Sequence, residues 1–336
     1  MFKPVMRPAA ASPLESCPGC PLCGAPQAGR EIARIPYRAI WDALALEWEV
    51  RPAREVVARL TPGDAASLRE CARCGLQYFT PARAGDGAFY ESLATSPRYY
   101  SSWKWEFGWV CDRLASGAAV LDVGCGAGDF LAAAALRGGR AVGLEQSAAA
   151  ARAARARGLQ VSEEPLEDFS RAHRREFDAV CLFHVLEHLE SVRPFLRTLL
   201  DCLRPGGSLF LSLPNRDRTF RQPLEPLDCP PHHLTRWSSR QIGWLAASLG
   251  LRLVEISREP VDVMQMRGEV ARRLRVRLEG IPGAGPALGR WSNRILVRTL
   301  LHPSICRLGD RTGVFDRLGM RGMAIAARCV LGAEAA

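Results

Sequence analysis

The chain has 336 residues, a formal net charge of +10 and 48% hydrophobic residues. This size and hydrophobic content exclude a disordered chain and predict a folded core with one accessory domain. The arginines that carry the charge are dispersed along the chain. The positive charge is therefore better explained by an arginine-rich composition than by an acidic partner such as nucleic acid or an anionic membrane. No apolar run reaches the about 18 residues of a membrane span and no signal peptide is visible, so we expect a cytoplasmic protein whose cysteines are thiols or metal ligands.

Two matching cysteine pairs occur near the N-terminus. Cys20 and Cys23, like Cys71 and Cys74, follow the pattern Cys-x-x-Cys-Gly, in which the glycine permits the positive φ of a tight turn. Four thiolates predict a closed, structural zinc site. The interval between the pairs is longer than is usual for a zinc site. Because Cys17 lies three residues before Cys20, the first pair could also be Cys17 and Cys20. The other alternative is a set of reduced, buried cysteines.

The region around these pairs predicts a zinc-ribbon-like domain over residues 1–85. Between the pairs, apolar residues from Ile40 to Trp48 recur at roughly helical spacing and predict a helical insert. An aromatic-rich stretch over residues 86–110 follows. It is either a helix that packs between domains or a lid over a ligand, with Tyr99 and Tyr100 the best lid candidates.

Residues 120–131, VLDVGCGAGDFL, predict a buried strand, a glycine turn and the start of a helix. Gly124, Gly126 and Gly128 let a ligand approach bare backbone, and the helix end offers unpaired N–H groups, as in a nucleotide site of an open α/β sheet. The spacing is not the Gly-x-Gly-x-x-Gly of dinucleotide enzymes. Asp122 would also repel a pyrophosphate, so the site suits a ligand with an ammonium group.

A second acid, Glu145, ends the next apolar run, which begins at Ala141. An acid at the tip of the second strand can accept both hydroxyls of a ribose. Together with Asp122 it predicts S-adenosylmethionine, which has an amino acid at one end and a ribose in the middle. A nicotinamide cofactor or an empty fold is the alternative.

Downstream, a helix capped by Ser147, a short strand at 159–161 and a fourth strand at 177–183 are expected.

Four segments in register resemble the class I S-adenosylmethionine-dependent methyltransferases: VLDVGCGAGDFL, GLEQS at 143–147, FDAVCLFHVLEHL at 177–189 and LRPGGSLFLSLPN at 203–215. The resemblance implies an α/β, Rossmann-like domain over residues 111–336. Its seven-stranded, mostly parallel sheet would have the order 3-2-1-4-5-7-6 and one reversed strand. With the small N-terminal zinc ribbon, the chain is similar to sugar C-methyltransferase-like proteins, to methyltransferase families of types 11, 12 and 23, and more loosely to some ribosomal RNA methyltransferases.

The resemblance also implies which residues contact the cofactor. Asp122 would bind the amino group, Glu145 the ribose, and the loop with Leu166 and Glu167 the adenine. The full set of expected contacts is Asp122, Gly124, Gly126, Gly128, Glu145, Gln146, Leu166, Glu167, Phe183 and His184.

Histidines gather in two places. His184, Glu187 and His188 are spaced to share one face of a helical turn, and His232 and His233 follow the fifth strand. The segment HHLTRWS resembles the Glu-His-x-x-Tyr-Phe-Ser segment of sugar C-methyltransferases, which implies that His233 is a general base. This chain departs from that pattern, with a histidine in place of the glutamate and a tryptophan at the second aromatic position.

Two alternatives for the histidines stay open. Quinone-pathway O-methyltransferases and small-RNA 3′-end methyltransferases carry Glu-x-x-Glu-His and a later histidine, which would place a divalent metal on Glu187, His188 and His233. In this chain His184 replaces the first glutamate of that pattern, which disfavours a hard cation such as Mg²⁺. The other alternative is a purely structural cluster of histidines and acids.

The C-terminal part predicts a helix at 234–250, a strand at 251–256 and a last strand at 322–330. Between these strands lies a helical insertion at about 261–318, with arginine-bearing helices at 263–278 and 287–301. It could pack on the core, cap a pocket, form a dimer or rest on a membrane surface.

We therefore expect methyl transfer to a small molecule, such as a sugar, a cell-surface precursor or a secondary-metabolite precursor, by in-line displacement. His233, His188 and Glu187 are the catalytic candidates, and structural Zn²⁺ is the second cofactor. The alternatives are an RNA methyltransferase whose zinc ribbon and arginines contact phosphates, and a binding module with a vestigial cofactor site. The acceptor atom and the oligomeric state cannot be derived from the sequence.

Overall fold

The structure is a computed structural model that describes residues 19–26, 29–97, 99, 104–218, 225–260 and 323–332. The chain divides into two compact units, of which the second comprises Asn215–Gln222 and Arg258–Ala324. The predicted insertion at about 261–318, with its two helices, lies outside the described residues, as do Cys17 and Tyr100.

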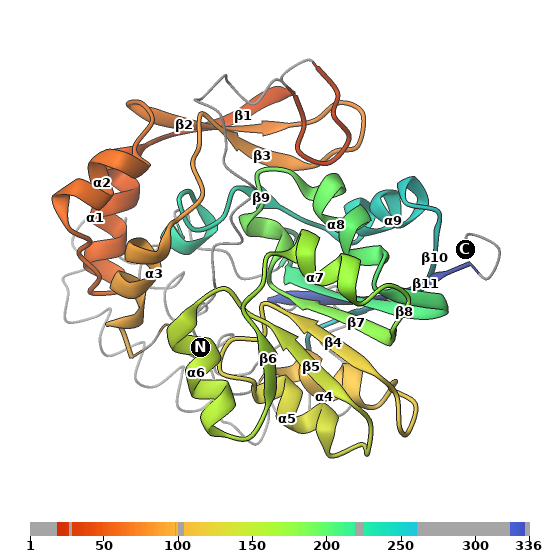
Figure 1. Cartoon of the computed structure of the whole chain (residues 1–336). Coiled ribbons are helices and arrows are strands. Elements are labelled where there is room, and N and C mark those ends of the chain that lie inside the picture. The colour runs from red at the N-terminus through yellow and green to blue at the C-terminus, as the bar shows by residue number, and fades with distance from the viewer. Residues whose placement is uncertain are drawn as a thin grey trace, which may run out of the picture. The chain divides into compact units, whose positions relative to one another are not determined.

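A seven-stranded sheet forms the centre of the larger unit (Figure 1). Its order is β10-β11-β8-β7-β4-β5-β6, which is the predicted order 3-2-1-4-5-7-6 read from the other edge. The pairs β4–β5, β5–β6, β4–β7 and β7–β8 are parallel. The strands are β4 Val120–Val123, β5 Ala141–Leu144, β6 Gln160–Ser162, β7 Phe177–Phe183, β8 Leu203–Pro214, β10 Leu251–Arg258 and β11 Ala324–Leu331. The predicted fold class is therefore confirmed.

The strand β11 runs against its two neighbours. Asn215, just after the end of β8, donates its N–H to the carbonyl oxygen of Met323, just before β11 begins. Glu259, just after β10 ends, donates its N–H to the carbonyl oxygen of Ala324. Because the start of β11 lies beside the ends of β8 and β10, it is the one reversed strand that the resemblance implied.

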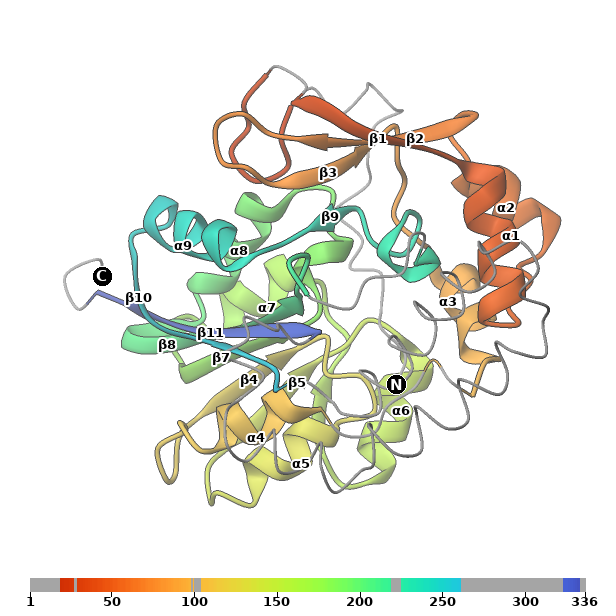
Figure 2. The ribbon, with the colours of Figure 1, turned by 180° about the vertical axis from the view of Figure 1, so that it is seen from behind.

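Helices cover both faces of the sheet, and the alternation along β7 shows why. Val180 and Leu182 lie in one apolar cluster with α7 Leu166–Ala172, α8 Val192–Leu200 and α9 Ser239–Ser248. Phe183 and Cys181 lie in a second cluster with α4 Trp105–Cys111 and α5 Asp129–Ala135. Successive side chains of a strand point to opposite faces, so a strand covered on both sides is apolar throughout. Figure 2 shows the same two layers from behind. The helix α6 Ala148–Ala156 begins after Ser147, whose Oγ accepts from the N–H of Ala150, as expected.

A second, four-stranded sheet has the order β1-β2-β3-β9. Its strands are β1 Arg30–Pro36, β2 Ala65–Glu70, β3 Gln77–Thr80 and β9 Thr235–Arg236. The helices α1 Tyr37–Glu47 and α2 Arg54–Leu60 form the expected insert between β1 and β2, and α3 Gly87–Ala94 follows β3. The first three strands come from the N-terminal region, whereas β9 comes from the histidine-bearing segment after β8.

The helix predicted at 234–250 was wrong at its start. Thr235 and Arg236 pair with β3, and α9 begins only at Ser239. Ser238 and Gln241 form a capping box, in which each residue bonds the other's backbone, and this fixes the first turn of α9 there. Among the described residues, no helix is both long and apolar enough to span a bilayer.

Candidate functional site

The glycine turn after β4 is specified by both backbone and packing. Gly124, Gly126 and Gly128 have φ values of 74°, 58° and 84°, in the left-handed region that favours glycine. A Cβ built on Gly128 would also lie 2.3 Å from a methyl carbon of Leu159. The turn leads directly into α5 at Asp129, so backbone N–H groups line the carboxyl end of β4.

Asp122 lies in β4, two residues before this turn, and is only 2% exposed. Among the described residues, its Oδ1 has no hydrogen-bond partner. Burial raises the pKa of Asp122 to about 8, although the positive charge of Lys104 opposes this rise. A buried polar atom without a partner costs stability, so Oδ1 of Asp122 is an acceptor that a bound cationic or hydrogen-bonding group could satisfy.

Glu145 follows β5 and is completely buried. Its Oε2 accepts from the N–H of Gly126 at 2.9 Å, and its Oε1 accepts from the N–H of Ser147 at 2.7 Å. Burial raises the pKa of Glu145 to about 8, against the lowering effect of those two bonds. Each carboxylate oxygen can accept a second hydrogen bond, so Glu145 both holds the glycine turn and retains acceptor capacity for two hydroxyls.

The other expected cofactor residues differ in their surroundings. Gln146 is half-buried directly after Glu145, and Glu167 is exposed at the start of α7. Leu166 and Phe183 are buried in the apolar clusters on the two faces of the sheet. Phe183 packs against two other phenylalanine rings, with centroid distances of 4.6 and 4.8 Å, so its ring serves the core.

His184 follows β7 with a φ of 55°, a conformation that a non-glycine residue seldom adopts. Its Nε2 lies 2.7 Å from Oε1 of Glu106, and its Nδ1 lies 3.3 Å from Oε1 of Glu187. Both carboxylate side chains are at most 2% exposed. Burial alone would raise the pKa of Glu106, but the hydrogen bond and charge of His184 lower it to about 2. The histidine thus bridges two buried acids, one from α4 and one from the turn after β7.

The predicted helical turn over His184–His188 is only partly formed. A single 3-10 turn spans Leu186–His188, and His184 lies before it. Even so, the structure brings the two histidine groups together. Oε1 of Glu187 lies 3.8 Å from Nε2 of His188 and 3.9 Å from Nε2 of His233. The rings of His188 and His233 are 4.9 Å apart.

His232 is held by two hydrogen bonds. Its Nδ1 donates to the carbonyl oxygen of Leu227 at 2.8 Å, so its Nε2 accepts from the hydroxyl of Tyr99 at 2.9 Å. Tyr99, a lid candidate from the sequence, therefore contacts the histidine group. His233 has a different acid beside it, because its Nδ1 lies 3.7 Å from Oδ1 of Asp228.

Three residues of this group were not predicted. Tyr90 of α3 places its hydroxyl 3.0 Å from Nδ1 of His188, Glu106 pairs with His184, and Asp228 stands beside His233. Tyr90 and Glu106 are far in sequence from the histidines that they contact, whereas Asp228 is only five residues before His233. The sequence gives a signal for Glu106 alone, because an acid between two aromatic residues, Trp105 and Phe107, is unusual in a helix that packs on a core.

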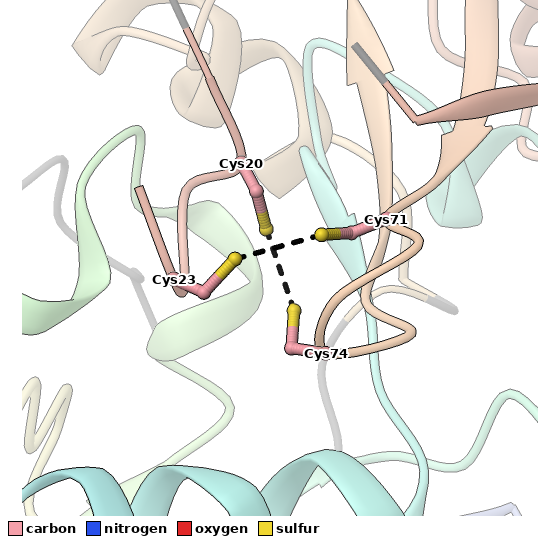
Figure 3. A group of neighbouring side chains, drawn as sticks. All are labelled: Cys20, Cys23, Cys71 and Cys74. Carbon is pink, nitrogen blue, oxygen red and sulfur yellow. Dashed lines mark hydrogen bonds between the residues drawn. The ribbon is translucent and has the colours of Figure 1, made fainter. Parts of the chain in front are cut away.

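The four cysteines converge as two crossed pairs (Figure 3). Sγ of Cys20 lies 3.5 Å from Sγ of Cys74, and Sγ of Cys23 lies 3.5 Å from Sγ of Cys71. All four sulfur atoms lie within 4.8 Å of one another. Sulfur atoms bound to one tetrahedral Zn²⁺ would be separated by about 3.8 Å, so this donor set suits a metal ion that prefers thiolates.

The methyltransferase domain family matches residues 98–256. These residues include the glycine turn, Asp122, Glu145 and both histidine groups. Residues 98–256 form a class I S-adenosylmethionine-dependent methyltransferase domain. In this domain the two buried acids lie at the carboxyl ends of β4 and β5, the sheet edge where ligands of open α/β folds bind.

Relatives of known name match about a third of the chain. Ubiquinone biosynthesis O-methyltransferase of Escherichia coli O7:K1 is 30% identical over 118 residues, which are 33% of this chain and 49% of the relative. The enzyme of the same name from Pseudomonas savastanoi pv. phaseolicola is 33% identical over 116 residues, 32% of this chain and 50% of the relative. The chain spans about half the length of the curated relatives it matches.

Solved structures similar to the chain include two methyltransferases. One is a SAM-dependent methyltransferase from Archaeoglobus fulgidus, with 18% identity, a TM-score of 0.44 and coverage of 67% of this chain and 94% of that chain. The other is a putative sarcosine dimethylglycine methyltransferase from Galdieria sulphuraria, with 14% identity, a TM-score of 0.45 and coverage of 74% of this chain and 89% of that chain.

Proposed function

We propose that the chain transfers a methyl group from S-adenosylmethionine to a small-molecule acceptor. The observation that carries this proposal is the buried carboxylate of Asp122, which has an oxygen without a hydrogen-bond partner beside a left-handed glycine turn. That place suits an ammonium group and rejects a pyrophosphate. The match of residues 98–256 to the methyltransferase domain family supports the same conclusion.

Within this proposal, Asp122 binds the amino group of the methionine part and Glu145 binds the ribose. Gly124, Gly126 and Gly128 let the cofactor approach the backbone, and Gln146 and the start of α7 at Leu166 and Glu167 border the adenine. The bound cofactor would supply a methyl group already activated by its sulfonium. The residues of the chain then have to align the acceptor for in-line attack and take up its proton.

His233 is the residue that we propose as the general base. Both ring nitrogens of His232 are hydrogen-bonded, and both ring nitrogens of His184 face carboxylates. The ring nitrogens of His233 also face carboxylates, those of Glu187 and Asp228, but at 3.9 and 3.7 Å, farther than the contacts of 2.7 and 3.3 Å that hold His184. Two acids at this distance stabilise the imidazolium that forms when the ring takes a proton. His188, next to the same Glu187, assists as the neighbouring donor or acceptor.

Replacement of His233 by asparagine is expected to lower methyl transfer by about 100- to 10,000-fold, the usual contribution of a general base. Affinity for S-adenosylmethionine should stay within about threefold of wild type. The measurement is transfer of a labelled methyl group to a small-molecule extract of the source cells, with mass spectrometry of the products. The matched control is His173→Asn, because His173 pairs with Glu176 away from both sites.

Unchanged transfer by His233→Asn would remove the base assignment. Transfer that requires an added divalent cation would favour the metal alternative on Glu187, His188 and His233. Transfer to RNA that declines steeply with salt would favour the RNA alternative.

The pKa values of about 8 for Asp122 and Glu145 predict a pH-dependent cofactor affinity. Below pH 8 these groups hold protons, and Asp122 must lose its proton before it can bind an ammonium group as a carboxylate. The affinity for S-adenosylmethionine should therefore fall by about tenfold or more between pH 8 and pH 6.5. Calorimetry at several pH values, in buffers of different ionisation enthalpy, measures the affinity and the protons released.

The stability of the unliganded protein should change in the opposite direction. Between about pH 4 and pH 8 the folded protein holds protons on Asp122 and Glu145 that the unfolded chain has released. The free energy of unfolding therefore falls as pH rises through this window.

A cofactor affinity that is constant from pH 6.5 to pH 8.5 would contradict the roles of both acids.

We also propose that Cys20, Cys23, Cys71 and Cys74 bind Zn²⁺ as a structural ion. The support is the donor set itself, which consists of four buried thiols on two matching turns. A zinc ion with four thiolates keeps no open position for a substrate, so it would stabilise the N-terminal sheet and take no part in the methyl transfer.

A further inference from the structure

The segment with His232 and His233, residues 225–236, is bound by the N-terminal region and is called the histidine loop below. Its end, β9, pairs with β3 through Thr235 and Tyr78. The N–H of Phe79 donates to the carbonyl oxygen of Leu234 at 2.9 Å. The N–H of Gly85 donates to the carbonyl oxygen of Pro231 at 2.8 Å. The end of the loop is thus the fourth strand of the N-terminal sheet.

Side chains add to this attachment. Trp48 at the end of α1 donates its Nε1–H to Oε1 of Glu225 at 3.1 Å. The guanidinium of Arg236 lies over the ring of Phe79, 5.2 Å from its centroid. The loop therefore contacts both the N-terminal sheet and the helical insert, which lies between the two cysteine pairs in the sequence.

Leu234 connects the loop to the catalytic side. While its carbonyl oxygen accepts from Phe79, its N–H donates to the carbonyl oxygen of Glu187 at 2.8 Å. The residue just before it is His233, and Glu187 carries the carboxylate that faces His233 and His188. A displacement of β3 would thus be transmitted through one residue to all three catalytic candidates.

The second cysteine pair lies at the start of β3. The N–H of Cys71 donates to the carbonyl oxygen of Leu76, and Gln77 begins the strand. The carbonyl oxygen of Cys74 accepts from Nε2 of Gln241 at 3.0 Å. Oε1 of Gln241 in turn accepts from the N–H of Ser238, two residues after the loop ends. The cysteine centre is therefore connected to the histidine loop in two ways, through β3 and through Gln241.

A metal ion would hold these two routes in place. The pairs Cys20–Cys23 and Cys71–Cys74 lie on separate turns, and four thiolates repel one another unless a cation binds them all. We propose that metal binding at the four-cysteine centre orders the histidine loop, so that this centre positions the acceptor side of the active site and leaves the cofactor side unaffected. The acceptor-side role rests on the proposed function, whereas the ordering of the loop does not.

Hydrogen exchange measured by mass spectrometry on the full chain tests this proposal without an acceptor. Zinc-loaded protein is compared with protein stripped by a chelator, with the metal content measured in both. In stripped protein, exchange in residues 229–236 and 186–190 should be at least about tenfold faster. Exchange in residues 120–128 and 143–147 should not change, and the affinity for S-adenosylmethionine should stay within about threefold.

A second variant keeps the test valid if stripping unfolds the N-terminal sheet. Gln241→Glu keeps an acceptor oxygen for the N–H of Ser238 but replaces the amide N–H that binds the carbonyl oxygen of Cys74 by a second oxygen. With zinc bound, it should speed exchange in residues 229–236 by about threefold or more. The matched control is Gln160→Glu, at an exposed position in β6, which should change nothing in the loop.

Equal protection of residues 229–236 with and without metal, or in Gln241→Glu and wild type, overturns the proposal. So does a protected loop in protein that holds no metal as purified. Failure of the proposed function has a different signature. If wild-type protein does not bind S-adenosylmethionine, the methyltransferase assignment fails, while the exchange result still decides whether the metal orders the loop.

Discussion

Replacement of Asp122 by asparagine is expected to weaken the binding of S-adenosylmethionine by about 10- to 100-fold, the usual worth of a charge-assisted hydrogen bond. The variant keeps the size and shape of the side chain but removes the charge that would face the ammonium group. The unliganded variant should at the same time be more stable than wild type at pH 8. The reason is that a neutral amide is cheaper to bury than the wild-type carboxylate, one oxygen of which has no partner among the described residues.

Calorimetric titration and thermal unfolding of the same preparations measure both effects. The matched control is Asp201→Asn, because Asp201 is exposed at the end of α8. It should change neither quantity by more than a small margin. A gain in stability together with a loss of affinity is typical of a group retained for binding. If affinity is unchanged, Asp122 does not bind the amino group, and the choice of cofactor loses its main support.

Replacement of Cys71 by serine is expected to lower the free energy of unfolding by about 3 kcal/mol or more, and Tm by roughly 6–12 °C. Cys71 is one of four thiols on two separate turns, so its loss would open a metal site that ties both turns together. A chelator should produce a similar shift in the wild-type protein and no further shift in the variant. Differential scanning calorimetry with zinc in slight excess provides the measurement.

Cys111→Ser is the matched control, because Cys111 is half-buried on α4 and belongs to neither cysteine pair. It should lower Tm by only a few degrees. If Cys71→Ser and Cys111→Ser behave alike and the chelator has no effect, the four cysteines are reduced thiols and no metal joins them.

The core of the fold could be predicted because its signals are local and strong. Val120, Leu121 and Val123 form a short apolar strand directly before a glycine turn, and this pattern has few alternatives. The order of the seven strands followed once the four family segments were recognised in register. Asp122 and Glu145 were found for the same reason, because ligands of open α/β sheets bind at the carboxyl ends of the strands.

The attachment of the histidine loop could not be predicted. A two-residue strand such as Thr235–Arg236 has no periodicity, and the apolar spacing of Leu234 continued into α9. Its place is decided by the pairing of Thr235 with Tyr78 and by the hydrogen bond from Phe79 to Leu234, partners more than 150 residues earlier in the chain. Pairing over such a separation depends on the tertiary structure and leaves no trace in a local pattern.

The histidine group shows the same limit within a single motif. Helical spacing predicted one face for His184 and His188, whereas His184 takes a left-handed conformation and turns to Glu106. That acid lies in α4, before the glycine turn, and nothing in the spacing of the histidines points to it. The residues of the group could be named from the sequence, but their hydrogen-bond partners could not.

We propose that the sheet edge around Asp122 and Glu145 binds a sulfonium nucleoside rather than a phosphate-bearing cofactor. Calorimetric titration of the wild-type protein at pH 8 with S-adenosylmethionine and with NAD tests it most directly. We expect saturable binding of S-adenosylmethionine at micromolar concentration, lost or weakened in Asp122→Asn, and no measurable binding of NAD. Saturable binding of NAD, with no heat from S-adenosylmethionine, would contradict it.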